Sequence, residues 1–210
     1  QMVEIARALA HEARIVVINS RIGPYGDYAT PEQAIPTIAP GEPWELCLTM
    51  NRGWSMATDP SYKSTGELIR MLAECAGMGG NLLLNVAPLG DGTIFYEQAR
   101  ILREIGAWLK INGEGIYGTR AGLPASHWSG ASTCSADGRT VYLILFGRPG
   151  DEVPIKGLRN QVLSATVLGG DGAQLARRSS GGAPWMNIPG ILWLNVPDAA
   201  CQTHGTVIKL

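Results

Sequence analysis

The feature that most constrains this chain is the stretch from Gly79 to Pro88, which reads GGNLLLNVAP. Two glycines open it, a proline closes it, and its leucines show no alternation of apolar and polar residues. Such a run is typical of a strand buried on both faces, as in a parallel sheet. Asn85 follows the leucines, and α/β barrels place their chemistry at this end of a strand. Taken alone, the pattern also fits a purely structural core strand with turn asparagines at its ends.

Upstream of this strand, helical and strand patterns alternate. Residues 1–13 have the apolar spacing of a helix, and residues 15–18 (IVVI) form a second buried-strand run, which together indicate one step of a repeating βα architecture. Residue 1 enters this spacing directly, with no signal-peptide pattern, so we expect the chain to begin inside a domain. The irregular segment 22–43 follows, and a loop of this length after a parallel strand is more often functional than idle. Glu32 is its notable residue, although a charged loop residue is commonly just solvated.

The next elements have clear local signals. Residues 44–50 (WELCLTM) predict a strand. Residues 64–67 have the S-x-x-E form of a capping box, and the apolar spacing after them predicts a helix that ends near residues 77–80. A last amphipathic helix carries Ile101, Ile105 and Trp108 and ends at the Asn-Gly pair 112–113.

The pattern changes near Thr119. Helical spacing disappears, and β-rich segments alternate with turn signals, as is typical of a small antiparallel β-sandwich. We place the domain boundary between residues 118 and 119. The clearest predicted strands are 141–146, 162–168, 191–196 and 206–210.

Composition excludes several classes of protein. With a net charge of -1, the chain has no basic surplus that would indicate nucleic-acid binding. No apolar stretch approaches the roughly 20 residues that span a bilayer. The 4 cysteines and 3 histidines are scattered without ligand spacing, so we expect no metal site, while disulfides stay undecided.

Four stretches together resemble one enzyme family. As a set, they are similar to the α-L-fucosidases of glycoside hydrolase family 29, almost continuously from about Ala13 to Arg120. Segments 19–21 and 27–33 also resemble the family's NDRWG and DFxTPEQ region, with Ser20 in place of an Asp and Ile22 in place of a Trp. After Arg120 only the β-rich pattern matches. The four stretches are WELCLTMNRGW, YKSTGELI, GGNLLLNVAPLGDGTI and IGAWLKINGEGIYGTR.

The resemblance implies an α/β fold, an imperfect (β/α)8 barrel followed by a β-sandwich. A barrel needs roughly 250 residues, about twice what precedes Thr119. We therefore expect residues 1–118 to be the C-terminal half of the catalytic barrel and residues 119–210 to be the sandwich. The family's nucleophile is an Asp in a segment that would precede Gln1, so this residue is expected to be missing here.

The resemblance also implies the roles of particular residues. Retaining glycosidases use two carboxyl groups about 5 to 5.5 Å apart. Glu32 matches the acid/base position of some members, and Glu45 is the runner-up because that position shifts between branches. Arg21 and Trp54 match sugar-binding positions, and Tyr28 is a weaker match.

The implied activity is retaining hydrolysis of terminal α-L-fucose, with fucosylated glycans as substrates and no metal or cofactor. We expect little activity from these residues alone, with Asp27 the nearest stand-in carboxylate and turn duty its more ordinary role. Alternatives are a non-catalytic carbohydrate-binding or structural fragment, or one piece of a split enzyme. An open strand edge would be covered by a homo-oligomer or an N-terminal companion chain. Family members act in the periplasm, in lysosomes or as secreted enzymes.

Overall fold

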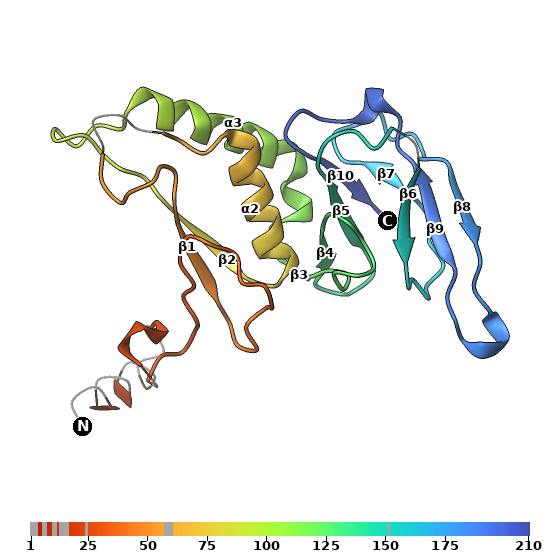
Figure 1. Cartoon of the computed structure of the whole chain (residues 1–210), viewed down its shortest axis with the longest axis horizontal. Helices are drawn as coiled ribbons and strands as arrows, with labels where there is room; N and C mark the ends of the chain where they lie inside the picture. Colours follow the sequence, from red (N-terminus) through yellow and green to blue (C-terminus); the bar gives the residue numbers. More distant parts are fainter. Residues whose placement is uncertain are drawn as a thin grey trace.

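The computed structural model describes residues 4–5, 8–9, 12, 17–23, 25–56, 61–150 and 152–210. The helix predicted over residues 1–13 and the strand predicted over 15–18 fall largely outside these ranges. Figure 1 shows a parallel strand pair at one end of the molecule, two antiparallel sheets at the other, and helix α2 between them. The chain therefore divides into two regions of different architecture.

The first region is built on parallel strands. Strands β1 (Glu45–Thr49) and β2 (Asn81–Asn85) pair in parallel. On the other side of β1, isolated parallel bridges join Glu32 to Cys47, residue 29 to 44, and residue 19 to 28. The same direction is therefore shared by four segments: β1, β2, residues 28–32 and the segment at residue 19. We call the end at which β1 and β2 finish, at Thr49 and Asn85, the carboxyl edge.

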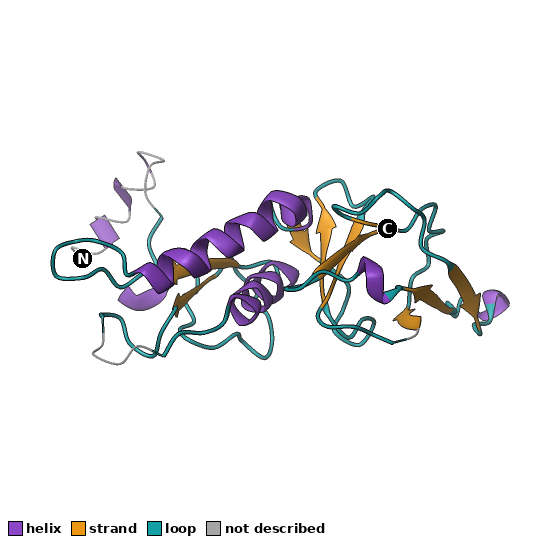
Figure 2. Cartoon of the chain, turned by 90° about the horizontal axis from the view of Figure 1, so that it is seen from above, coloured by secondary structure: helices purple, strands orange, loops and turns teal. Residues whose placement is uncertain are grey.

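Helix α2 (Thr65–Gly77) begins and ends close to the predicted positions, and α3 (Tyr96–Asn112) ends where it was predicted to end. The capping box is present, since the Ser64 hydroxyl accepts the N–H of Glu67 and the Glu67 carboxylate accepts the N–H of Ser64. Figure 2 shows both helices from above. Their apolar residues share one core with buried residues of β1. The short 3-10 helices are η1 (Ser20–Ile22), η2 (Gly113–Gly115), η3 (Pro184–Met186) and η4 (Asp198–Ala200).

The prediction that β2 is buried on both faces is wrong for this chain. Leu82 and Leu84 pack against the helix-bearing core, whereas Leu83 is 50% exposed. Leu83 pairs with Cys47 of β1, which is also only partly buried. Successive side chains of a strand point to opposite faces, so the face that carries Leu83 lies away from the helices. Within the described residues, that face is open at Leu83 and covered at Thr49, which is fully buried.

Steric constraints explain why glycine occupies the first two positions of the GGNLLLN motif. Gly79 has a φ of 76°, a conformation that glycine adopts without penalty. A Cβ on Gly80 would lie 2.2 Å from the ring of Trp44, which is only 2% exposed. The indole Nε1 of Trp44 donates a hydrogen bond to the carbonyl of Met78 at 3.4 Å. The motif therefore lets the chain turn from α2 into β2 directly over a buried indole.

The second region consists of a five-stranded and a three-stranded antiparallel sheet. Three of the predicted strands are confirmed at 141–145, 191–195 and 206–209, but in segment 162–168 only residues 166–167 pair, and Leu163 is 80% exposed. In sheet order, the strands are β3 (Thr119–Ala121), β4 (Ala131–Ser135), β5 (Val141–Leu145), β10 (Thr206–Lys209) and β7 (Thr166–Val167), then β6 (Glu152–Lys156), β9 (Ile191–Asn195) and β8 (Arg177–Ser180).

The five-stranded sheet is covered on both faces. Tyr142 and Ile144 of β5 belong to the core that contains the helices, whereas Leu143 and Leu145 belong to the core shared with the three-stranded sheet. The alternation of a strand sends neighbouring residues to opposite faces, which explains this division. One sheet therefore separates two hydrophobic cores.

Candidate functional site

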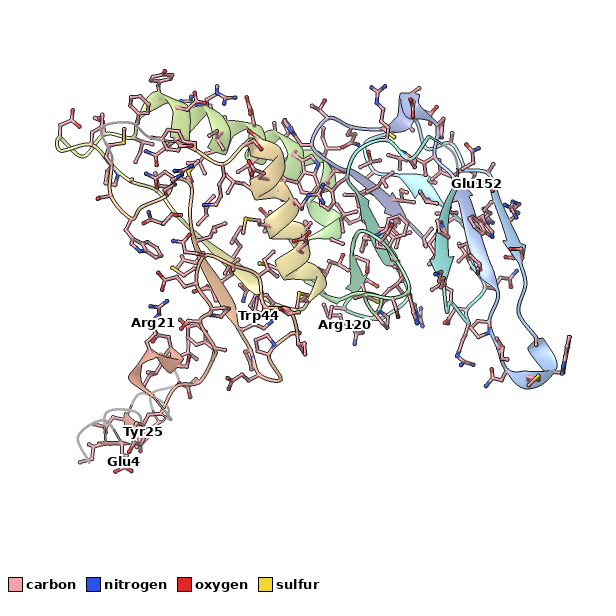
Figure 3. The ribbon with its side chains drawn as sticks, in the orientation of Figure 1. Glu4, Arg21, Tyr25, Trp44, Arg120 and Glu152 are labelled. Atoms are coloured by element: carbon pink, nitrogen blue, oxygen red, sulfur yellow. The ribbon has the colours of Figure 1, made fainter. Side chains whose placement is uncertain are left out.

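The predicted acid/base residue lies in an ion pair. The side chain of Asn19 accepts the backbone N–H of Arg21 at 3.1 Å and caps η1, which fixes where the arginine leaves the backbone. Arg21 Nη2 then donates to Glu32 Oε2 at 2.5 Å. The hydrogen bond to Glu32 raises the pKa of Arg21. The side chains are 51% and 34% exposed, so this pair is open to solvent (Figure 3 labels Arg21).

The backbone around Glu32 is tied to β1. Cys47 donates its N–H to the carbonyl of Pro31 at 3.0 Å, and Gln33 donates its N–H to the carbonyl of Cys47 at 2.9 Å. Gln33 has a φ of 64°, which is uncommon for a residue other than glycine. Glu32 therefore sits level with Cys47, the middle residue of β1, and the side chain of Gln33 reaches Thr49 at the carboxyl edge.

Trp54 is held above the same edge by its backbone. Asn85 Nδ2, at the end of β2, donates to the carbonyl of Trp54 at 3.1 Å. Asn51 Nδ2, just beyond β1, donates to the carbonyl of Ser55 at 3.3 Å. The side chain of Trp54 is 46% exposed. The second asparagine of the GGNLLLN motif thus anchors the loop that presents the indole.

A buried polar network lies beneath this edge. Thr49 is fully buried and Asn51 is 2% exposed. Lys63 Nζ donates to the carbonyls of Thr49 at 2.8 Å and Asn51 at 3.3 Å, and burial lowers the pKa of Lys63. Sequence reasoning missed these three residues and Gln33. Only Asn51 had a signal in the sequence, because it begins the polar run that follows the predicted strand.

The other nominated residues lie elsewhere. Glu45 begins β1 opposite Asn81, toward the amino end of the strand, and Arg21 pairs with Glu32 rather than with Glu45. Asp27 Oδ2 accepts the backbone N–H of Ile18 at 2.8 Å, so its side chain joins two neighbouring segments rather than closing a turn. The carbonyl of the half-buried Tyr28 accepts the N–H of Ser20 at 3.0 Å.

The described residues contain no group of three or more His, Cys, Asp or Glu side chains that could hold a metal ion. The 4 cysteines are all free thiols. None of the helices in the described ranges is long and apolar enough to cross a membrane.

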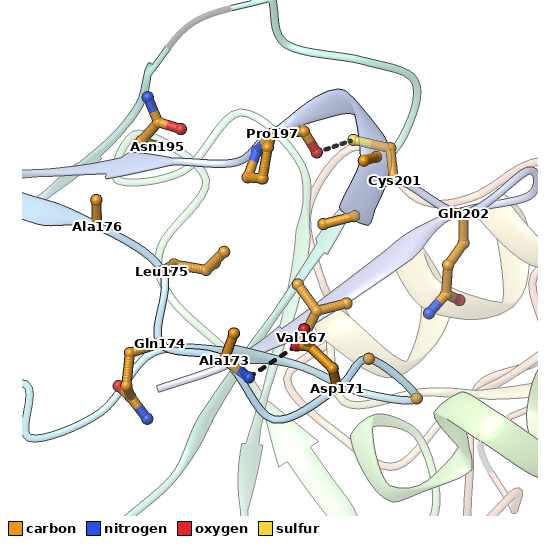
Figure 4. Close-up of a pocket in the computed structure, with 14 residues that line it drawn as sticks. Val167, Asp171, Ala173, Gln174, Leu175, Ala176, Asn195, Pro197, Cys201 and Gln202 are labelled. Carbon is orange, nitrogen blue, oxygen red and sulfur yellow. Dashed lines mark hydrogen bonds between the residues drawn. The ribbon is translucent and has the colours of Figure 1, made fainter.

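A cavity of about 620 Å³ lies in the antiparallel region and contains none of the nominated residues (Figure 4). Most of its polar side chains are hydrogen-bonded within the chain. Asp171 Oδ1 accepts the N–H of Ala173 at 2.9 Å, and Gln202 Nε2 donates to the carbonyl of Leu168 at 2.7 Å. The cavity therefore offers few free groups for a ligand.

Comparisons with known proteins agree on one family. The family model described as Alpha-L-fucosidase matches residues 1–114. A Branchiostoma floridae alpha-L-fucosidase is 36% identical over 99 residues, covering 45% of this chain and 22% of the relative. A Dictyostelium discoideum alpha-L-fucosidase is 31% identical over 206 residues, covering 90% of this chain and 43% of the relative.

A solved structure extends this agreement to the fold. Alpha-L-fucosidase isoenzyme 1 from Paenibacillus thiaminolyticus superposes with a TM-score of 0.84 at 30% identity, covering 99% of this chain and 52% of that chain. Both regions of the chain are therefore included in the match. The chain spans about half the length of this protein and less than half of the curated relatives named above.

Proposed function

Since the chain belongs to the alpha-L-fucosidase family, we propose that it supplies the proton-transferring part of an active site that hydrolyses terminal α-linked fucose with retention. The observation that carries this proposal is the Arg21–Glu32 pair, because the next residue, Gln33, contacts Thr49 at the carboxyl edge, where the Trp54 loop is also anchored. Active sites of α/β barrels are assembled at this end of the strands.

Glu32 is the proposed acid and base. In the first step its proton passes to the leaving oxygen while the glycosidic C–O bond breaks and its electron pair stays on that oxygen. A second carboxylate forms the bond to the anomeric carbon. In the second step Glu32 takes a proton from water, which attacks the same carbon and releases the second carboxylate. We propose that the second carboxylate lies outside these 210 residues.

The proposed sugar contacts come from Arg21, Trp54 and, more weakly, Tyr28. The guanidinium of Arg21 is a fixed fork of donors that suits hydroxyl and ring oxygens. In the free chain it is engaged with Glu32, so substrate must redirect it and leave the carboxyl free to carry its proton. The exposed indole of Trp54 suits the apolar face and methyl group of fucose.

We further propose that residues 1–118 form the C-terminal half of a (β/α)8-type barrel and that residues 119–210 form a β-sandwich. The parallel direction of β1, β2 and the bridged segments supports the first part. Two antiparallel sheets around one core support the second. A barrel interior is packed with side chains, so the open face of β2 would be covered by a companion segment or by another copy of the chain. The substrates would be fucosylated glycans, met in the periplasm, in lysosomes or outside the cell.

The test is how kcat/KM depends on the leaving group of the substrate, measured in the complete enzyme that contains these residues. Glu32→Gln is expected to lower kcat/KM by roughly 10²- to 10⁴-fold for a fucoside with a poor leaving group. The loss should be much smaller for dinitrophenyl fucoside, because that leaving group needs little protonation. Glu42→Gln, an exposed residue of the same loop, is the matched control. Equal losses on both substrates would contradict the assignment and favour a non-catalytic role.

A further inference from the structure

Gln33, the residue after Glu32, has features that neither its neighbours nor a solvated loop explains. Its φ of 64° is unfavourable for a side chain with a Cβ, and such strain persists only where surrounding contacts hold it. Its Oε1 lies 3.1 Å from the hydroxyl of Thr49 and 3.4 Å from the backbone N of Thr49. Thr49 is fully buried whereas Gln33 is exposed, so this contact joins the loop at the surface to the interior beneath it.

The contact connects Glu32 to the loop that presents Trp54. The hydroxyl of Thr49 also lies 2.5 Å from the carbonyl of Asn51, whose side chain anchors the loop at Ser55. Lys63 Nζ holds the carbonyls of both Thr49 and Asn51. These contacts hold the members of the network against one another, although Thr49 has one hydroxyl proton for two acceptors and Asn51 Oδ1 has no partner among the described residues.

We propose that Gln33 and Thr49 are positioning residues that set where the Glu32 carboxyl stands relative to Trp54. This inference rests on the proposed function. Gln33 fixes the backbone on one side of Glu32 through the left-handed turn, and Thr49 fixes Gln33. Proton transfer depends steeply on placement, so loosening this contact weakens proton donation more than it weakens substrate binding.

Two variants test the contact in different ways. Gln33→Asn keeps a residue that tolerates positive φ but shortens the side chain so that it no longer reaches Thr49. Thr49→Val keeps the shape and removes the hydroxyl. In the complete enzyme, both should lower kcat/KM about tenfold for a fucoside with a poor leaving group, while kcat/KM for dinitrophenyl fucoside should fall less than twofold.

Thr133→Val is the matched control. Thr133 is also fully buried and donates its hydroxyl to a carbonyl, that of Gly115, at 2.6 Å, but it lies in β4 of the antiparallel region. This variant loses a comparable hydrogen bond without touching the site. It should lower the unfolding temperature as much as Thr49→Val does, with the leaving-group dependence unchanged.

The outcomes separate the two proposals. The inference is supported if the loss of kcat/KM is larger for the poor leaving group in three variants, Glu32→Gln, Gln33→Asn and Thr49→Val. The same difference must be absent from Thr133→Val. Dependence in Glu32→Gln alone overturns the positioning role and leaves the proposed function standing. An equal change in Thr133→Val attributes the effect to lost stability and also overturns the inference. No dependence in Glu32→Gln overturns both proposals.

Discussion

The β1–β2 pair and the five-stranded sheet both pack against the helix-bearing core, yet they are covered differently. The five-stranded sheet has buried residues on both faces, with Ile144 on one side and Leu143 on the other. In the β1–β2 pair, Leu48 is fully buried while Leu83 is 50% exposed. The nominated site residues all lie in the region with the open sheet. The comparison teaches that the five-stranded sheet is covered on both faces by described residues, whereas the region that holds the nominated residues leaves Leu83 of β2 half exposed.

The largest expected effect tests this difference directly. Leu143→Ala should lower the free energy of unfolding by about 2 to 5 kcal/mol, because Leu143 is fully buried between the sheets. Leu83→Ala in the chain by itself should cost less than about 1 kcal/mol, because half of its surface already meets water. Urea unfolding of the two variants measures both values. Equal losses would mean that the open face is covered in solution.

The second effect concerns the link between β2 and the core. Gly80→Ala should cost about 1 to 3 kcal/mol, because the new Cβ would overlap the ring of Trp44, which is too buried to move aside. Gly90→Ala is the control, since a Cβ there meets no heavy atom within 4 Å. Thermal unfolding followed by circular dichroism compares them. A Gly80→Ala variant as stable as the control would show that the indole can be displaced.

A smaller effect is expected at the start of α2, the helix between the two regions. Ser64→Ala removes the side-chain half of the capping box and should cost about 1 kcal/mol. Ser61→Ala, at an exposed position just before the helix, should cost much less. Both are read from urea unfolding midpoints at constant slope. Identical midpoints would show that packing alone starts the helix.

The parts of the fold that could be predicted from the sequence are those with local signals. Features that depend on contacts between distant residues could not be predicted. Helix α2 was predictable because its cap and its apolar spacing are local. Strand β4 was not, because its ASTCS sequence has small side chains suited to a close approach by α2, where a Cβ on Gly77 would lie 2.9 Å from the carbonyl oxygen of Ser132. The exposure of Leu83 depends on whether another segment packs on its face of β2, and the leucine run itself carries no information about that.

The candidate site shows the same limit. Arg21 and Glu32 were nominated by resemblance, and the structure places them in one ion pair. The contact of Gln33 with Thr49 joins residues sixteen positions apart and depends on an unusual backbone angle, so it leaves no pattern in the sequence.

The smallest effect is a pH dependence where the regions meet. Glu114 of η2 accepts hydrogen bonds from Lys209 of β10 at 2.6 Å and from Tyr142 of β5 at 2.8 Å, and these lower its pKa, with Lys209 the larger cause. A carboxyl with a lowered pKa in the folded state stabilises above its unfolded pKa of about 4.3, and this contribution is lost as pH falls through the folded value.

Stability measured by urea unfolding should therefore fall more steeply between about pH 5 and pH 3 in the parent chain than in Glu114→Gln. The difference should be under about 1 kcal/mol, because the carboxylate is half exposed and the pair is screened by water. Parallel pH profiles in the two proteins would mean that this ion pair contributes nothing to folding.

The place of β10 in the five-stranded sheet has a consequence for how the chain folds during synthesis. This strand is the last in the sequence, yet it lies between β5 and β7, with Val207 in one core and Ile208 in the other. A ribosome delivers residues in order, and segments that emerge early must wait for late partners. Neither core can close until residues 206–209 have left the exit tunnel. The nascent chain therefore holds two unfinished apolar surfaces until β10 emerges, and a chaperone that shields them would be needed most just before that point.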